Sequence, residues 1–162
     1  MRLYRIISIN HSWMQRLIMK IFGYLLGNET DGVLFFKEKH LLLPLNARYG
    51  PVRLRSTMSR LLLFLLEKGN IGLIRDEHIM KNVWEIHGLK ASGPRLWQVV
   101  NDLKNKLAKV GVDNNFIMRV EGRGYLINNL YVESIYIRAA WVMLDNFMLE
   151  SQNITSFKLV KE

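Results

Sequence analysis

The sequence predicts an α+β fold in which an antiparallel sheet precedes three helices and a short β-hairpin ends the domain. Residues 21–54 contain short apolar runs separated by turn residues, which is typical of a small antiparallel sheet. Residues 56–109 change to apolar spacings of three and four, which indicate amphipathic helices. Residues 116–127 contain two β-type runs joined by EGRG. The 49% hydrophobic content of the 162 residues is enough to bury a core.

Four strands are expected in residues 21–54. The apolar runs are IFGYLL, VLFF, LLLPL and VRL, and the turns between them are GNETDG, KEKH and NARYGP. Asn46, Gly50 and Pro51 suit the last of these turns. We therefore expect a four-stranded antiparallel sheet ahead of the helices.

Two helices should follow the sheet. The first is expected over residues 56–68, behind a cap at Ser56 or Thr57. Its apolar side consists of Leu61, Leu62, Leu65 and Leu66. A second helix is expected over residues 76–84, after a short link. Both should bury their apolar sides in one core.

A third helix is expected over residues 93–109, because Ser92 can cap it and Pro94 fits its first turn. Gly111 lies just beyond its end. Its apolar stripe consists of Leu96, Val99, Val100, Leu103 and Leu107. Its polar side consists of Arg95, Gln98, Asn101, Asp102, Asn105 and Lys106, with Lys104 and Lys109 at the margins. Arginine, glutamine and asparagine can read base edges and lysine contacts phosphates, so this is a candidate DNA-reading helix. The alternative is an ordinary solvated helix surface.

The hairpin should place one arginine at its tip. Gly122 and Gly124 permit the positive φ angles of a tight turn, and Arg123 between them must project outward. A projecting arginine suits a phosphate or a narrow minor groove, whereas the alternative is a merely solvated turn residue. Arg119 could reinforce such a contact, and Glu121 opposes it with negative charge.

Two tryptophans have open interpretations. Trp84 ends the second helix, where its indole N–H could donate to a phosphate, or where the ring could be a plain core residue. Trp97 lies in the first exposed turn of the third helix. It could stack on a sugar or a thymine methyl group, or it could pack against a terminal helix.

Composition favours a polyanionic partner and gives no support to catalysis. The net charge is +9, and the segment of residues 128–162 is the only one with a negative net charge, −1.

The chain has no cysteine, and its four histidines show no metal-ligand spacing, so we expect no metal and no cofactor. Asp76 and Glu77 are more simply favourable charge at a helix N-terminus than an acid/base pair. No phosphate-binding glycine loop is present, and we expect no enzyme.

The domain should have an extension at each end. Residues 1–20 are expected to be partly helical from Asn10 or Ser12, and residues 131–150 are expected to form a largely apolar helix. Such a helix must bury its surface against the domain or against another chain, so it is a candidate dimerisation element. The apolar run at residues 17–26 is short, and the run at residues 131–149 contains three charges, so no integral membrane segment is expected. The +3 N-terminal segment could instead lie on an anionic membrane surface.

Four segments resemble the OmpR/PhoB-type winged helix-turn-helix DNA-binding domain of bacterial response regulators and of ToxR/CadC-like one-component regulators. They are LRSTMSR, RDEHIMKNVW, LWQVVNDLKNKL and EGRGYLI, and the resemblance covers about residues 31–127. It implies a four-stranded N-terminal sheet, a three-helix core and a C-terminal hairpin wing. It also implies that the 85–91 loop occupies the place where some members touch RNA polymerase.

The resemblance places phosphate and base contacts on a defined set of residues. Together with the polar residues identified above, the expected DNA-binding set is Trp84, Arg95, Trp97, Gln98, Asn101, Asp102, Lys104, Asn105, Arg119 and Arg123. Asp102 departs from the family, which often has a basic residue there. An acid facing DNA repels phosphate unless it accepts from a cytosine amine, so the target sequence does not transfer.

We therefore expect a sequence-specific DNA-binding transcriptional regulator with its recognition helix, residues 93–109, in the major groove and its wing, residues 116–127, on the backbone or minor groove. The domain should span residues 21–127, between the extensions at 1–20 and 128–162. A cytoplasmic, nucleoid-associated homodimer is expected, with no phosphorylation switch in this chain, since neither a receiver domain nor a membrane span accompanies the module. The alternative is a protein-interaction adaptor that keeps the fold without specific DNA reading.

Overall fold

A computed structural model describes residues 19–27, 31–69, 72–128 and 132–138. The chain divides into two compact units, one of which is Gly23–Ile135. The other consists of Met1–Phe22 and Tyr136–Glu162, of which only residues 19–22 and 136–138 are described. The helix expected from Asn10 or Ser12 lies outside the described residues, except that residues 19 and 20 already belong to a strand.

The N-terminal strands form an antiparallel meander, as predicted. They are β1 (Met19–Leu26), β2 (Val33–Phe36), β3 (Leu41–Pro44) and β4 (Val52–Arg53). In the β2–β3 pair Phe35 lies opposite Leu42, and both side chains are fully buried. Buried and half-buried side chains therefore alternate along β2, and the buried ones place one face of the meander against the core.

The sheet has a fifth strand, which the local sequence pattern does not predict. Its order is β4-β3-β2-β1-β8, and β8 is Val132–Arg138. The expected helix over residues 131–150 is therefore wrong for residues 132–138, while residues 139–150 lie outside the described residues. Val132, Ile135 and Tyr136 are side chains that favour strands, and pairing beside β1 satisfies the backbone groups of the strand. Long-range pairing thus outweighs the helical spacing of the apolar residues.

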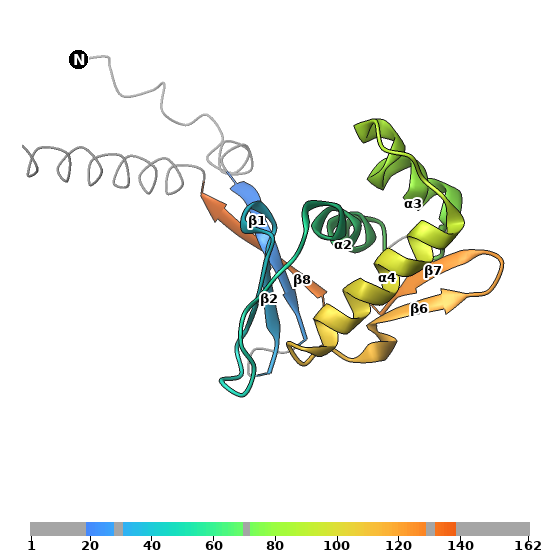
Figure 1. Cartoon of the computed structure of the whole chain (residues 1–162). Coiled ribbons are helices and arrows are strands. Elements are labelled where there is room, and N and C mark those ends of the chain that lie inside the picture. Colours follow the sequence, from blue (N-terminus) through green and yellow to red (C-terminus); the bar gives the residue numbers. More distant parts are fainter. Residues whose placement is uncertain (1–18, 28–30, 70–71, 129–131, 139–162) are drawn as a thin grey trace, which may run out of the picture. The chain divides into compact units, whose positions relative to one another are not determined.

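Helix α2 (Ser56–Lys68) has the predicted bounds. Leu61, Leu62 and Leu65 on its apolar side are fully buried. The expected cap is not formed, because Arg55 is the N-cap residue and makes no side-chain capping bond, while Ser56 is already helical. Figure 1 shows α2 in the middle of its unit, with β1 and β2 on one side and the other helices on the opposite side.

Helices α3 (Asp76–Val83) and α4 (Gly93–Ala108) pack on α2 and on each other. The single turn η3 (Glu85–His87) begins the loop between them. The Ser92 hydroxyl accepts a hydrogen bond from the backbone N–H of Arg95 at 3.3 Å, so the predicted cap of α4 is confirmed. Pro94 lies in the first turn of the helix, as predicted.

The wing is a three-stranded sheet. Strands β6 (Ile117–Val120) and β7 (Gly124–Ile127) form the predicted hairpin, and β5 (Ile74–Arg75), in the link before α3, pairs with β7. The hairpin glycines adopt positive φ angles, 65° at Gly122 and 158° at Gly124, as the turn predicted. The third strand ties the wing to the helix core, and in Figure 1 the hairpin projects beside α4.

Candidate nucleic-acid interface

Helix α4 presents a polar face and buries an apolar one. Leu96, Val100, Leu103 and Leu107 are buried, whereas Gln98, Asp102 and Asn105 are exposed. Asn101 and Lys104 are half-buried at the edges of the polar face. The buried stripe fixes the rotation of the helix, so the side chains predicted to read DNA are the ones that solvent reaches.

Trp97 lies on this polar face with 62% of its surface exposed. Burial of a large aromatic ring lowers the free energy of a protein or an interface, so leaving most of this ring in water is unfavourable. Among the residues that the structure describes, its neighbours cover only the smaller part of its surface. The ring is therefore available for stacking, and the terminal segments that formed the alternative lie outside the described residues.

Trp84 has the opposite environment, with 1% of its surface exposed. Its side chain is a core residue at the end of α3, so the structure does not support its expected contact with a phosphate. The indole Nε1 is buried without a hydrogen-bond partner among the described residues. Only the core interpretation of this tryptophan agrees with the structure.

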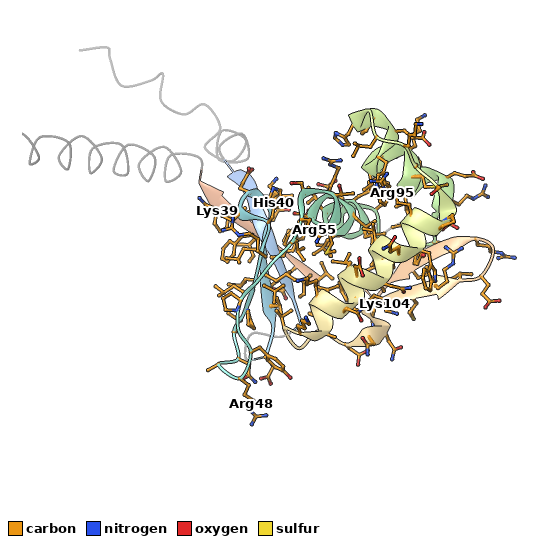
Figure 2. The ribbon with its side chains drawn as sticks, in the orientation of Figure 1. Lys39, His40, Arg48, Arg55, Arg95 and Lys104 are labelled. Carbon is orange, nitrogen blue, oxygen red and sulfur yellow. The ribbon has the colours of Figure 1, made fainter. Side chains whose placement is uncertain are left out.

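Arg95 joins the start of α4 to the preceding loop. Its Nη1 donates to the carbonyl oxygen of Lys90 at 3.2 Å, while its backbone N–H donates to the Ser92 hydroxyl. The side chain remains exposed, so other N–H groups of the guanidinium face solvent. Figure 2 shows Arg95 and Lys104 at different points along α4, so the helix carries positive side chains at both places.

The wing places Arg123 at an exposed tip, as predicted. Glu121, two residues earlier, is exposed as well. The backbone N–H of Asp76, the first residue of α3, donates to the Arg123 carbonyl at 3.4 Å. The backbone at the tip is thereby held against the helix core, while the arginine side chain is free to project.

Arg119 is engaged within the protein. Its Nη1 and Nη2 donate to the two carboxylate oxygens of Asp76 at 2.5 and 2.7 Å, and its guanidinium lies 4.6 Å from the centre of the Tyr125 ring. The hydrogen bonds to Asp76 raise the pKa of Arg119, and burial raises the pKa of the Tyr125 hydroxyl. Two of the five N–H groups of Arg119 therefore bind a carboxylate, so its expected phosphate contact stays a prediction that only the remaining donors could fulfil. Sequence reasoning missed this pair, since its members are 43 positions apart and no local pattern joins them.

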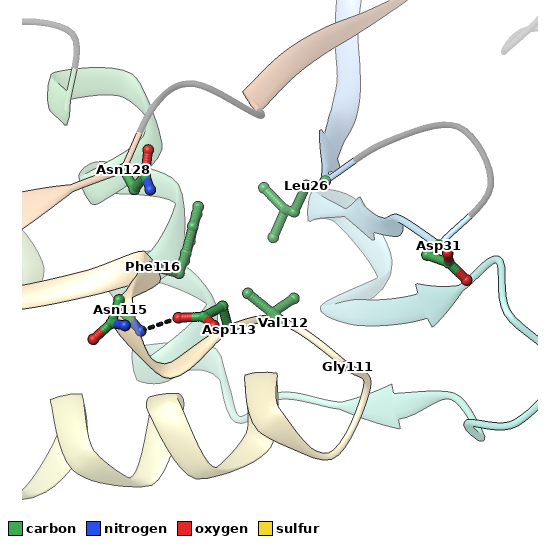
Figure 3. A pocket seen from close by; sticks show the side chains of 9 residues that line it. Leu26, Asp31, Gly111, Val112, Asp113, Asn115, Phe116 and Asn128 are labelled. Atoms are coloured by element: carbon green, nitrogen blue, oxygen red, sulfur yellow. Dashed lines mark hydrogen bonds between the residues drawn. The ribbon is translucent and has the colours of Figure 1, made fainter.

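A cavity of about 520 Å³ opens just beyond the end of α4 (Figure 3). Its lining is Leu26, Gly27, Asp31, Gly111, Val112, Asp113, Asn115, Phe116 and Asn128. The Asp113 carboxylate accepts from the Asn115 backbone N–H at 2.6 Å, and Asp31 accepts from Asn46 at 2.7 Å. Both carboxylates therefore already accept hydrogen bonds from the protein. The described residues contain no cluster of groups that could hold a metal ion.

The region that contains the polar face of α4, its buried stripe and the braced wing is similar in sequence to a known family. The sequence model described as "Transcriptional regulatory protein, C terminal" matches residues 50–127. The match covers the three helices and the wing, which is slightly less than half of the 162 residues. The OmpR/PhoB-type resemblance predicted from the four sequence segments is thus confirmed for residues 50–127.

Solved structures agree with this winged helix-turn-helix fold. Eleven solved chains are significantly similar. Among them, the DNA-binding domain of E. coli CadC has a TM-score of 0.56 at 16% sequence identity, over 70% of this chain and 96% of that chain. No curated protein is significantly similar in sequence. Within the described residues, no helix has the length and apolar character that crossing a membrane requires.

Proposed function

We propose that this regulator reads specific DNA sequences by placing α4 in the major groove and the tip of the wing on the backbone or in the minor groove. The observation that carries this proposal is the exposure of Gln98, Asp102 and Asn105 on one face of a helix whose other face is buried. A major groove admits an α-helix, and base edges there present a distinct pattern for each base pair.

The roles differ along the helix. Gln98 and Asn101 carry amides that pair bidentately with adenine, so they select sequence. Lys104, Asn105 and the free donors of Arg95 suit phosphate oxygens, which orient the helix without selecting sequence. Asp102 fits only a donor such as the cytosine amine and repels a phosphate. Trp97 supplies an apolar surface for a thymine methyl group or a sugar.

The wing should supply an electrostatic anchor. Arg123 is exposed at the tip, where its guanidinium can meet a phosphate or a narrow, strongly negative minor groove. Neutralising a phosphate releases counterions, so each such contact steepens the salt dependence of binding. Arg123 should therefore contribute to binding of all sequences.

Selection of bound genomic fragments, followed by sequencing, tests the proposal directly. We expect an enriched sequence, whose ranking against variants changes in a Gln98→Ala, Asn101→Ala protein by about 1 to 3 kcal/mol for each lost base contact. An unchanged ranking would contradict the assigned readers. Absence of any enriched sequence would point to the adaptor function instead.

The wing contact has its own experiment. Arg123→Ala should weaken binding to every duplex and reduce the slope of log affinity against log salt by about one. Lys39→Ala is the matched control, because it also removes one exposed positive charge but lies in the turn η1 (Lys37–Lys39), which Figure 2 places beside the sheet. Equal slopes for the two variants would contradict a specific role for Arg123.

The 85–91 loop is proposed as a contact for RNA polymerase. Ile86 is 60% exposed and Leu89 is 39% exposed, so the loop offers apolar surface that a partner protein could cover. Ile86→Asp should reduce transcription from a target promoter while leaving DNA affinity unchanged. A parallel fall in DNA affinity would contradict this assignment.

We further propose a cytoplasmic, nucleoid-associated bacterial regulator without enzymatic activity, which pairs into a homodimer through its C-terminal residues. Pairing over two half-sites increases specificity for a module of this size. Light scattering at concentrations where DNA is bound tightly measures the oligomeric state. A monomer on and off DNA would contradict the dimer.

A further inference from the structure

We propose that Asp76 is a positioning residue for the wing, and that Arg119 binds the carboxylate of Asp76 and does not bind a phosphate. The inference rests on the proposed contact between Arg123 and DNA and adds the device that holds Arg123 in place. Asp76 is the first residue of α3 and therefore belongs to the helix core. Arg119 lies on β6, in the wing.

The side chain of Asp76 makes the first connection. Its two oxygens accept from Nη1 and Nη2 of Arg119, which gives the fork-to-fork arrangement that fixes both distance and orientation. On its other side the guanidinium lies over the ring of Tyr125, at 4.6 Å from the centroid, and this ring is buried. The cation is thus held between a residue of α3 and a residue of the neighbouring strand β7.

The backbone of Asp76 makes the second connection. Its N–H donates to the Arg123 carbonyl at the tip of the wing, and the residue before it, Arg75, pairs with Gly124. A Cβ on Gly124 would overlap the carbonyl oxygen of Ile74, so glycine is what allows β5 to approach β7 this closely. One residue of the core therefore holds both a strand of the wing and its tip.

This connection matters because a hairpin alone is a weak structure. An isolated two-stranded hairpin is marginally stable in water, and a mobile tip must be ordered when it binds. Holding Arg123 before DNA arrives removes part of that entropic cost. We call the Asp76–Arg119 pair with the Asp76–Arg123 backbone bond the wing latch.

The latch makes a prediction opposite to simple electrostatics. Asp76→Asn removes a negative charge from a DNA-binding surface, which by charge alone should tighten binding. If the latch positions the wing, the same variant should bind DNA more weakly, by about two- to fivefold for a partly exposed ion pair. Arg119→Gln should weaken binding to a similar extent with an unchanged salt slope, because Arg119 neutralises no phosphate.

Glu77→Gln is the matched control. It removes the same charge from the same first turn of α3, and so it reproduces any loss of favourable charge at the helix N-terminus. We expect Glu77→Gln to leave the wing unchanged and DNA affinity equal or slightly higher. Arg119→Lys keeps the positive charge without the fork, and should behave as Arg119→Gln does.

Amide hydrogen exchange of the free protein gives a readout that does not depend on DNA. In Asp76→Asn and Arg119→Gln, the amides of Asp76 and of residues 117–127 should exchange faster than in the wild type and in Glu77→Gln. The double variant Asp76→Arg, Arg119→Asp rebuilds the pair in reverse and should recover slow exchange, at least in part.

The outcomes separate the latch from the proposed DNA contact. Tighter binding with a steeper salt slope in Asp76→Asn would overturn the inference, because it would mean that a released Arg119 binds phosphate. Unchanged exchange in the wing would overturn it as well. Faster exchange with unchanged DNA affinity would support the latch while contradicting the contact of Arg123 with DNA.

Discussion

The guanidinium of Arg60, on α2, donates from Nη1 to the backbone carbonyl oxygen of Val83, the last residue of α3, at 2.8 Å. The last carbonyl groups of a helix have no partner within the helix, and a cation there also complements the helix dipole. The bond fixes the end of α3 where the chain turns toward the 85–91 loop and α4. It therefore supports the geometry of the helix-turn-helix from outside that motif.

Replacing Arg60 should destabilise the domain. Arg60→Met keeps much of the aliphatic volume but leaves the Val83 carbonyl without its charged donor, so we expect a loss of about 1.5 to 3 kcal/mol in the free energy of unfolding. Urea denaturation measures this loss. Arg55→Met is the control, because Arg55 precedes the same helix, is exposed and makes no side-chain capping bond. Equal stability of the two variants would contradict the role of Arg60.

The two glycines of the wing should differ in their tolerance of alanine. At Gly122 a Cβ meets nothing within 4 Å, so Gly122→Ala should cost only about 1 to 2 kcal/mol for the left-handed backbone. At Gly124 a Cβ would overlap the Ile74 carbonyl, so Gly124→Ala must also separate β5 from β7. Thermal denaturation should rank Gly124→Ala as clearly the less stable variant. The reverse ranking would contradict the close approach of the two strands.

Two tryptophans should respond oppositely to truncation. Trp84→Ala leaves a large cavity in the core and should cost about 3 to 5 kcal/mol of stability. Trp97→Ala removes a ring that is mostly exposed, so its stability should change by less than about 0.5 kcal/mol while its DNA affinity falls. Chemical denaturation and a DNA titration of each variant distinguish these effects. A marked loss of stability in Trp97→Ala would mean that the ring is packed in solution.

The free energy of unfolding should decrease in alkaline solution because the hydroxyl of Tyr125 ionises. Burial raises the pKa of its hydroxyl above the ordinary value of 10.0, so the folded state holds this proton more tightly than the unfolded state. The resulting stabilisation is complete below pH 10 and is lost as pH rises through the higher pKa of the folded state. The free energy of unfolding should therefore decrease more steeply between about pH 9.5 and 11 in the wild type than in Tyr125→Phe. Parallel curves for the two proteins would contradict the raised pKa.

Local patterns were sufficient for the three core helices and the hairpin. The spacing of Leu61, Leu62 and Leu65 predicts both the bounds and the buried side of α2, because a helix brings such positions onto one face. Ser92 and Gly122 are similar cases, since a helix cap and a positive-φ turn depend on chemistry within a few residues. The polar face of α4 followed from the same periodicity.

The sequence by itself determined the order of the first four strands, the three core helices and the hairpin, the rotation of α4 and the position of Arg123 at the wing tip. Each of these depends on neighbouring residues. The tertiary structure decided which side chains are free to act. Trp84 and Arg119 have residue types that suit DNA, but one is buried and the other binds Asp76 from 43 positions away. The strand at residues 132–138 was likewise decided by its place beside β1. Burial and pairing between distant segments depend on the whole fold, so no local pattern carries them.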